Sequence, residues 1–296
     1  MAMRPTKAHI DLDALRHNLS VAARHAPGSK NLAVIKANAY GHGMEEAAQA
    51  LGSHADALAV ATIDEAVSLR EAGISDSLLV LQGVTTREEF REAAARNLWL
   101  MVHEAGQLQR LLEHDGPPLG IWLKIDTGMH RLGFAPGDVA DACARLNASP
   151  AVSQPPVLCT HLACADDLDS PVTDQQLKAF ADCTRNHALP LSIANSAGIM
   201  HWPQTSANWN RPGIMLYGSE PTGTYAGKSE LEAVMTVTSE IMAIRDIGPG
   251  EGVGYGHRWK ADTPSRIGTV SIGYGDGYPR HAPGGTPVLV NGNRVP

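Results

Sequence analysis

The chain has 296 residues, of which 43% are hydrophobic and 19% are charged, and its formal net charge is −7. This composition is typical of a globular protein with one large domain or two smaller ones, and it excludes a disordered or collagen-like chain. The acidic balance argues against nucleic acid or a membrane surface as a partner.

The predicted elements begin with an amphipathic helix over residues 11–25, in which Leu12, Leu15, Leu19 and Ala22 recur at helical spacing. Eight short apolar runs then alternate with helical patterns. The runs cover residues 31–37, 56–61, 77–82, 98–102, 119–126, 156–161, 190–194 and 212–217. Near-continuous apolar runs are typical of parallel strands that are buried on both faces.

Helix-start signals follow two of these runs. Thr62-x-x-Glu65 and Thr86-x-x-Glu89 have the pattern of a capping box, in which the two side chains bind the free N–H groups of a helix start. Strand and helix patterns that alternate eight times predict an α/β fold, a (β/α)8 barrel over residues 1–232.

The pattern changes over residues 233–296, where no helix is predicted. Residues 235–247 alternate, residues 267–272 form another apolar run, and Val288–Val290 leads into Asn291-Gly292, a strong hairpin-turn signal. This region is predicted to be a mainly-β domain. We expect it to be incomplete, because the chain stops before the return strand of the hairpin can be completed.

Three local features bear on the compartment and on metal binding. No apolar run approaches the length of a transmembrane helix, and the N-terminus shows no secretory signal pattern. The four cysteines lack the paired spacing of zinc ligands, so we expect no metal and interpret them as reduced thiols. Together these features predict a cytoplasmic location.

Lys36 lies in the most informative stretch, Ala33–Gly43, within or at the end of a predicted strand. A lysine is almost never fully buried without a partner. The ordinary interpretation is a surface lysine at a strand end. The functional interpretation is a desolvated amine of lowered pKa, which is suited to a Schiff base.

Further polar side chains flank other predicted strands. They are Arg131, His161, Asn195 with Ser196, and Arg211. If the strand order is right, nearly all of them converge on the C-terminal mouth of the barrel, where barrel enzymes keep their active sites. Taken singly, three of them have ordinary structural explanations: His161 as a core histidine, Arg131 as a surface ion-pair residue and Ser196 as a helix N-cap.

The segment Val34–Gly43 closely resembles the pyridoxal-phosphate attachment site of alanine racemases. The resemblance extends in the same order over essentially the whole chain. It continues through Lys124–Gly133, Thr160–Ala163, Asn195–Gly198, Arg211–Ile214, Gly252–Gly256 and Ile272–Tyr278. It implies a barrel that binds pyridoxal phosphate, followed by a β domain, and the racemisation of alanine as the activity.

The resemblance implies two catalytic residues. Lys36 would hold the cofactor and exchange the α-proton of D-alanine, and Tyr255 would serve L-alanine on the opposite face. Racemisation requires two such groups, because one takes the α-proton and the other returns a proton from behind. In the family the tyrosine comes from the second subunit, so a homodimer with its active sites at the interface is expected.

The resemblance also implies the supporting residues. Arg211 would face the pyridine nitrogen, and His161 would pack beside the ring and contact the Tyr255 hydroxyl. Arg131 would contact the substrate, and Lys124 would support Arg131, in some members as a carbamate. The cofactor-binding set would be Lys36, Tyr40, His161, Asn195, Ser196, Arg211, Gly213 and Ile214.

The sequence leaves alternatives open. In the family the chain continues past Asn291-Gly292 with a segment that completes the substrate pocket, so one alternative is a protein that binds pyridoxal phosphate without turnover. The presence of residues 233–296 argues against a single-domain protein that only carries pyridoxal phosphate. Arg211 argues against a decarboxylase that shares the barrel fold. The sequence does not distinguish a role in peptidoglycan synthesis from one in alanine catabolism.

Overall fold

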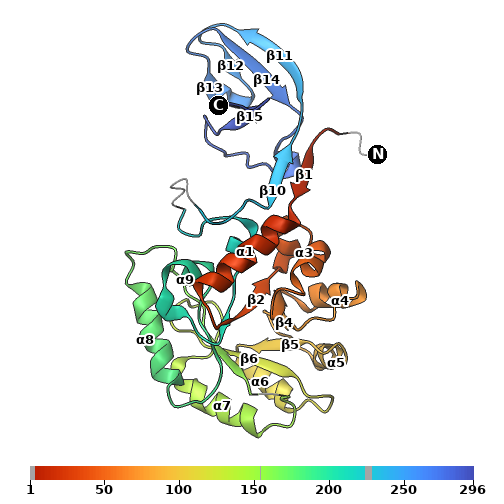
Figure 1. Cartoon of the computed structure of the whole chain (residues 1–296), viewed down its shortest axis with the longest axis vertical. Helices are drawn as coiled ribbons and strands as arrows, with labels where there is room; N and C mark the ends of the chain where they lie inside the picture. The colour runs from red at the N-terminus through yellow and green to blue at the C-terminus, as the bar shows by residue number, and fades with distance from the viewer. Residues whose placement is uncertain (1–3, 154, 224–228) are drawn as a thin grey trace. The chain divides into compact units, whose positions relative to one another are not determined.

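The computed structural model describes residues 4–153, 155–223 and 229–296 (Figure 1). Their contacts divide the chain into two compact units, residues 10–234 and residues 4–9 with 235–296. The sequence predicted that the barrel domain begins at residue 1, whereas residues 4–9 belong to the unit that contains residues 235–296. The reason is that strand β1 (Lys7–Ile10) pairs with strand β10 (Met235–Thr238).

Residues 10–234 contain a closed barrel of parallel strands. The strands are β2 (Lys30–Val34), β3 (Ala57–Val60), β4 (Leu78–Val80), β5 (Trp99–Val102), β6 (Gly120–Lys124), β7 (Val157–Cys159), β8 (Leu191–Ser192) and β9 (Trp209–Asn210). Each strand pairs with the next one in chain order, and β9 closes the ring on β2. The predicted (β/α)8 class is confirmed.

Helices surround this barrel (Figure 1). They are α1 (Leu12–His25), α2 (Lys36–Gly41), α3 (Met44–Leu51), α4 (Ile63–Glu71), α5 (Arg87–Ala95), α6 (Ala105–Leu112), α7 (Val139–Ala148), α8 (Val172–Thr184) and α9 (Ser196–His201). The first of them confirms the helix predicted over residues 11–25. None of the helices within the described ranges is long and apolar enough to cross a membrane.

The position predicted for the eighth strand is wrong. The run at residues 212–217 is not a strand: Ile214–Tyr217 form a 3-10 helix, η3, and the strand is the two-residue β9 just before it. Hydrophobicity alone cannot separate a short buried helix from a buried strand. As a consequence, Arg211 follows the last strand instead of preceding it.

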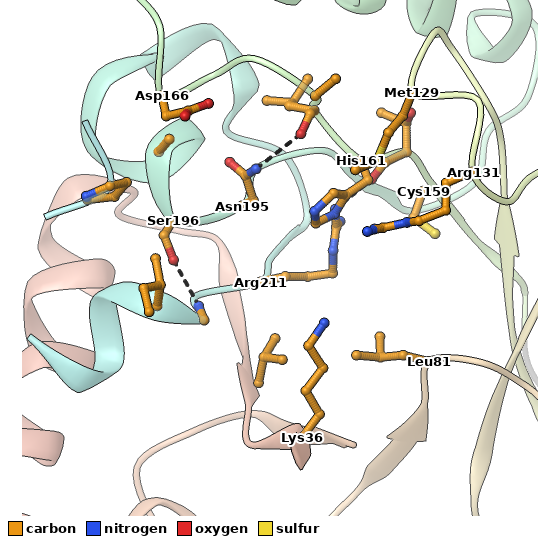
Figure 2. A pocket seen from close by; sticks show the side chains of 18 of the residues that line it. Lys36, Leu81, Met129, Arg131, Cys159, His161, Asp166, Asn195, Ser196 and Arg211 are labelled. Atoms are coloured by element: carbon orange, nitrogen blue, oxygen red, sulfur yellow. Dashed lines mark hydrogen bonds between the residues drawn. The ribbon is translucent and has the colours of Figure 1, made fainter. Parts of the chain in front are cut away.

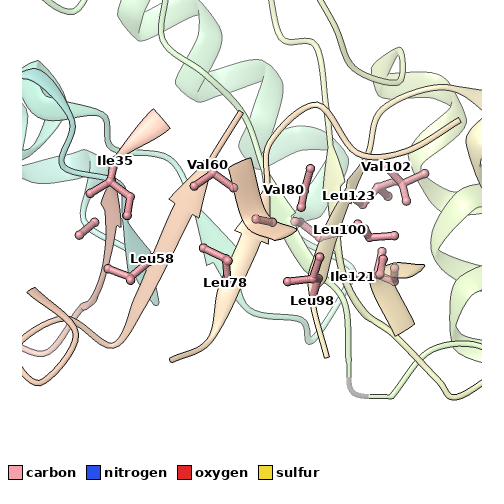
Figure 3. Close-up of a cluster of buried hydrophobic side chains, with 14 of the residues drawn as sticks. Ile35, Leu58, Val60, Leu78, Val80, Leu98, Leu100, Val102, Ile121 and Leu123 are labelled. Carbon is pink, nitrogen blue, oxygen red and sulfur yellow. The ribbon is translucent and has the colours of Figure 1, made fainter. Parts of the chain in front are cut away.

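The apolar residues of the barrel form two layers. In β4, for example, Leu78 and Val80 belong to the cluster between the strands and the helices, whereas Leu79 belongs to the cluster inside the barrel. Figure 3 shows part of the outer cluster, with Leu58 and Ile121 among its members. Because both faces of each strand are buried, the strands appear in the sequence as continuous apolar runs.

Among the described residues, Trp122 is the largest fully buried side chain; it lies inside the barrel, and its ring centroid is 5.5 Å from that of Trp209. Trp122→Ala leaves a cavity in this interior, so we expect the free energy of unfolding to fall by about 3–5 kcal/mol. Urea unfolding followed by circular dichroism measures the change. Leu168→Ala, at a residue that is 53% exposed, is the control and should change the free energy of unfolding by less than about 0.5 kcal/mol. Equal effects of the two substitutions would contradict this packing.

The second unit is mainly β, as the sequence predicts. Besides β1 and β10 it contains β11 (Ile241–Ile247), β12 (Gly252–Val253), β13 (Trp259–Lys260), β14 (Ser265–Val270), β15 (Val288–Val290), β16 (Asn293–Val295) and the 3-10 helices η4 (Tyr255–His257) and η5 (Tyr274–Asp276). Antiparallel pairs join β11 to β14, β12 to β13 and β15 to β16.

The hairpin predicted at Asn291-Gly292 is present. Both residues have positive φ, 49° and 80°, as a two-residue hairpin turn requires. The expectation that the chain stops before the return strand is completed is wrong for this hairpin, because β16 follows the turn and pairs with all three residues of β15, up to Val288 with Val295. Three residues after a tight turn are sufficient to pair with the three residues of β15.

Candidate active site

A cavity of about 640 Å³ lies within residues 10–234, where the barrel strands end (Figure 2). Ten of the eleven site residues expected from the sequence line it. They are Lys36, Tyr40, Lys124, Arg131, His161, Asn195, Ser196, Arg211, Gly213 and Ile214. Tyr255 is not among the lining residues: it begins η4 in the other unit, and the residue is 86% exposed.

Lys36 comes two residues after β2 and begins α2, so the strand is shorter than the sequence suggested. The four residues after it, Ala37–Tyr40, form a left-handed turn, with φ of 52° to 53°. Residues with a Cβ avoid this conformation, which costs about 1–2 kcal/mol for each of them. Contacts from the surrounding chain must therefore hold the turn. One of these is the 3.1 Å hydrogen bond from the Gly43 N–H to the Asn38 carbonyl.

The Lys36 side chain points into the cavity, toward Arg211 (Figure 2). Burial lowers the pKa of the amine, the positive charge of Arg131 lowers it further, and the negative charge of Glu65 partly offsets both. A lowered pKa leaves more of the amine neutral at physiological pH. This environment fits the desolvated amine that the sequence suggested, rather than a surface lysine.

Arg211 is buried directly after β9, and its guanidinium is fixed from several sides. It donates hydrogen bonds to the Ser192 hydroxyl and to the carbonyls of Thr160 and Ile193. Its Nη2 also lies 3.5 Å from Nδ1 of His161. The result is a cation that is held in place mainly by neutral oxygen atoms and stays charged at any physiological pH.

His161 follows β7 and lies beside this cation. Burial lowers the pKa of His161 to about 2, and the positive charges of Arg211 and Lys124 contribute to the shift. The imidazole is therefore neutral. Because the nearby guanidinium can only donate, the contact favours the tautomer in which Nδ1 accepts and Nε2 carries the proton.

Ser196 links two helix starts at one side of the cavity. Its hydroxyl accepts hydrogen bonds from the N–H groups of Gly213, at 3.0 Å, and Met215, at 3.2 Å. Asn195 caps the same helix, α9, by accepting from the Gly198 N–H at 3.0 Å. The N-cap role that the sequence analysis considered for Ser196 thus belongs to Asn195, and Ser196 instead fixes the start of η3.

Gly213 packs closely against Tyr40. A Cβ at position 213 would lie 3.0 Å from the Tyr40 hydroxyl, closer than is usual for such a contact. The Tyr40 ring in turn packs on Tyr217, at 4.8 Å between centroids, and Tyr217 donates a hydrogen bond to the Val34 carbonyl. The hydroxyl of Tyr40 and the starts of α9 and η3 therefore lie together, an arrangement that favours a bound anion.

Lys124 ends β6 and is buried, with 9% of the residue exposed. Burial lowers the pKa of its amine. The neighbours that act on its charge are the Cys159 thiol and three cations, Arg211, Arg131 and Lys36. Four basic side chains thus line one cavity, which makes it attractive to anionic ligands.

Arg131 lies in the exposed loop that follows β6, where Asp126 organises the backbone. One carboxylate oxygen of Asp126 accepts hydrogen bonds from the N–H groups of residues 128, 129 and 130, each at 3.0 Å. Gly133 closes the loop with φ of +136°, and a Cβ there would lie 2.5 Å from the Asp126 nitrogen. Only glycine fits this position, which explains its place in the motif.

Three carboxylates in or beside this region are not predicted from the sequence. Asp166 and Glu220 line the cavity, and Glu220 lies 2.8 Å from Nε2 of His201. Glu65 accepts a hydrogen bond from the Ala37 N–H, next to Lys36. Asp166 and Glu220 belong to no recognised motif, whereas Glu65 was visible only as part of a helix-capping pattern.

The fold and the cavity define an enzyme of the parallel-barrel class, with a cationic site at the carboxyl ends of the strands. Comparison with known families makes this more specific. The family model described as "Alanine racemase, N-terminal domain" matches residues 10–221, and "Alanine racemase, C-terminal domain" matches residues 234–296. The chain therefore belongs to the alanine racemase family, whose members are isomerases that use pyridoxal phosphate.

Individual relatives agree with this assignment. The chain is 47% identical to an alanine racemase of Xanthomonas axonopodis pv. citri over 296 residues, which is 99% of this chain and 80% of the relative. It is also 47% identical to a catabolic alanine racemase of Pseudomonas putida, covering 99% of this chain and 82% of the relative.

Solved structures give the same result. The biosynthetic alanine racemase from Pseudomonas aeruginosa superposes with a TM-score of 0.93 at 44% identity, over 99% of this chain and 82% of that one. An alanine racemase from Bartonella henselae with covalently bound pyridoxal phosphate superposes with a TM-score of 0.86 at 29% identity, over the same shares. The predicted family and fold are confirmed.

Proposed function

We propose that this chain interconverts L-alanine and D-alanine with pyridoxal phosphate bound at Lys36, and that its active site is completed by the partner subunit's Tyr255. The observation that carries the proposal is the position of Lys36: an amine of lowered pKa enters a cavity lined by three other cations. When bound, the cofactor withdraws electrons from the α-carbon of the amino acid and so makes its proton removable.

The residues present fit the cofactor's phosphate. The Ser196 hydroxyl, at the start of α9, accepts a hydrogen bond from the Gly213 N–H just before η3. The Tyr40 hydroxyl lies so close to Gly213 that a Cβ at position 213 would be only 3.0 Å from it. We assign the phosphate to this place, with Ser196, Gly213, Ile214 and Tyr40 around it and Asn195 fixing the helix start. The partial positive charge of helix starts, together with the hydroxyl protons of Ser196 and Tyr40, suits a dianion.

Arg211 would hold the ring nitrogen of the cofactor. Its contacts with Ser192, Thr160 and Ile193 fix the guanidinium in one orientation. A guanidinium does not give up its proton readily, so it can donate a hydrogen bond but does not protonate the nitrogen. A ring nitrogen that is not protonated would withdraw electrons from the α-carbon less strongly. Rapid return of the α-proton would then be favoured over competing reactions.

Two groups would move the α-proton, one on each face of the substrate. Lys36 would serve D-alanine, and its lowered pKa supports this role because a neutral amine is needed to accept a proton. The partner subunit's Tyr255 would serve L-alanine, with the neutral His161 as a hydrogen-bond partner for its hydroxyl. The proposal therefore requires a homodimer. A cytoplasmic location stays a prediction from the sequence.

Lys124 is expected to react with carbon dioxide to form a carbamate, releasing a proton. A buried amine of lowered pKa is nucleophilic, and the negative charge of a carbamate would orient Arg131 and offset the surrounding cations. Carbon-13 NMR after incubation with labelled bicarbonate should show one protein-bound carbamate. Lys124→Ala should remove that signal and Lys178→Ala, at an exposed lysine paired with Asp182, should retain it. A signal that survives Lys124→Ala would contradict the assignment.

The test of the proposed activity is proton exchange in deuterium oxide. The holoenzyme should exchange the α-proton of either enantiomer for deuterium, and each should be converted into the other. A chain that binds the cofactor but exchanges neither α-proton would refute the proposal and support binding without turnover.

A further inference from the structure

Glu65 departs from the capping pattern that its sequence predicts. In the Thr62-x-x-Glu65 motif, the Thr62 hydroxyl accepts from the Glu65 N–H at 3.4 Å, as expected. The two oxygens of the carboxylate, however, bind two different segments of the chain. Its Oε1 accepts from the Ala37 N–H and its Oε2 from the Ala61 N–H, each at 2.7 Å. It therefore joins the start of α4 to the turn after β2.

The equivalent residue in the next helix behaves differently. Glu89 in α5 completes a true capping box: its Oε2 accepts from the N–H groups of Thr86, at 2.9 Å, and Thr85, at 2.8 Å. Both donors belong to its own helix start. Glu65 instead reaches a donor 28 residues away in the sequence, so its carboxylate has a second role that Glu89 lacks.

The distant donor is the peptide N–H next to Lys36. Ala37 is exposed and begins the left-handed turn, so packing of its own side chain does little to hold this backbone. A hydrogen bond to a carboxylate is shorter and stronger than one between neutral groups. The bond to Glu65 thus fixes the peptide that sets the direction of the Lys36 side chain.

Glu65 also acts on the charge of Lys36. The basic and acidic groups around this amine are Arg131, Lys124, Arg211 and Glu65, while the nearby His161 is neutral. Glu65 is the member of this set that raises the pKa of Lys36, against burial and Arg131. Its removal would alter both the backbone and the electrostatic surroundings of the amine.

We propose that Glu65 is a positioning residue for Lys36, holding the left-handed turn so that the amine meets the cofactor and the substrate in one orientation. The proposal rests on the proposed function, in which Lys36 binds pyridoxal phosphate. Glu65 acts through the Ala37 N–H and touches neither the cofactor nor the substrate.

The test compares Glu65→Gln with Glu89→Gln. Glutamine keeps the size of the side chain but replaces one carboxylate oxygen with an NH2 group. Because Ala37 and Ala61 bind different oxygens of Glu65, one of the two N–H groups then faces a donor and loses its acceptor. In E65Q we expect faster hydrogen exchange over residues 36–43 and slower capture of added pyridoxal phosphate by the cofactor-free full chain. We also expect kcat to fall about 10- to 100-fold with little change in the KM for alanine. E89Q should match wild type in all three measurements.

Outcomes that contradict the proposal are distinct from failure of the proposed function. If the wild-type chain does not take up the cofactor at Lys36, the proposed function fails. If wild type takes it up and folded E65Q matches wild type in capture rate and kcat, Glu65 only caps a helix and the inference is overturned. Should E65Q not fold, Glu65→Asp gives the answer, because its shorter carboxylate keeps the charge and cannot reach both donors.

Discussion

Replacing Lys36 with alanine is expected to abolish racemisation in both directions. The loss of the proton-transferring group alone lowers the rate by about 10²–10⁴-fold, and loss of the covalent link to the cofactor lowers it further. The visible absorbance of the lysine-bound cofactor should disappear at the same time. Coupled assays of D-alanine and L-alanine formation, with an absorbance spectrum of the purified protein, measure both effects.

Lys178→Ala is the matched control for this experiment. Its side chain is 79% exposed on α8 and pairs with Asp182 at 2.6 Å, so its removal should leave activity and absorbance at wild-type values. A Lys36→Ala protein that retained the absorbance of a lysine-bound cofactor would contradict the assignment of Lys36 and point to another lysine.

Replacing Tyr255 with phenylalanine is expected to act differently on the two enantiomers. It removes only the hydroxyl, so removal of the α-proton of L-alanine should slow by about 10²–10⁴-fold. D-alanine should still exchange its α-proton for solvent deuterium through Lys36, but it should keep its configuration. Proton NMR and chiral chromatography, run on each enantiomer separately in deuterium oxide, distinguish these outcomes.

Trp259→Phe is the control for Tyr255→Phe, because Trp259 is another exposed aromatic residue of the same unit. It should leave the exchange of both enantiomers unchanged. Equal losses for D-alanine and L-alanine in Tyr255→Phe would contradict the proposed division of labour between the two groups.

The barrel could be predicted because its strands are buried on both faces. Leu78, Leu79 and Val80 are all fully buried, which leaves an unbroken apolar run in the sequence. The same signal failed at the eighth strand, where Ile214–Tyr217 is equally apolar but forms a 3-10 helix. Periodicity cannot resolve a four-residue element, and the true strand has only two residues.

The members of the cavity could be predicted, but the backbone that positions them could not. Arg131 and His161 follow strands, so the order of the elements alone places them at one end of the barrel. Arg211 reaches the same end only because the last strand, Trp209–Asn210, lies before it and not after it. The left-handed turn after Lys36 has no such signal, since alanine disfavours that conformation. It depends on a carboxylate 28 residues away, a contact that exists only in the folded chain.

A mixing experiment tests most directly the claim that two subunits share each active site. Lys36→Ala and Tyr255→Phe are each expected to show almost no racemisation as pure dimers. If the tyrosine comes from the partner subunit, a dimer with one chain of each kind has one intact site, so random exchange of subunits should restore about a quarter of the wild-type rate. No recovery, with exchange of subunits verified by native mass spectrometry, would contradict the account.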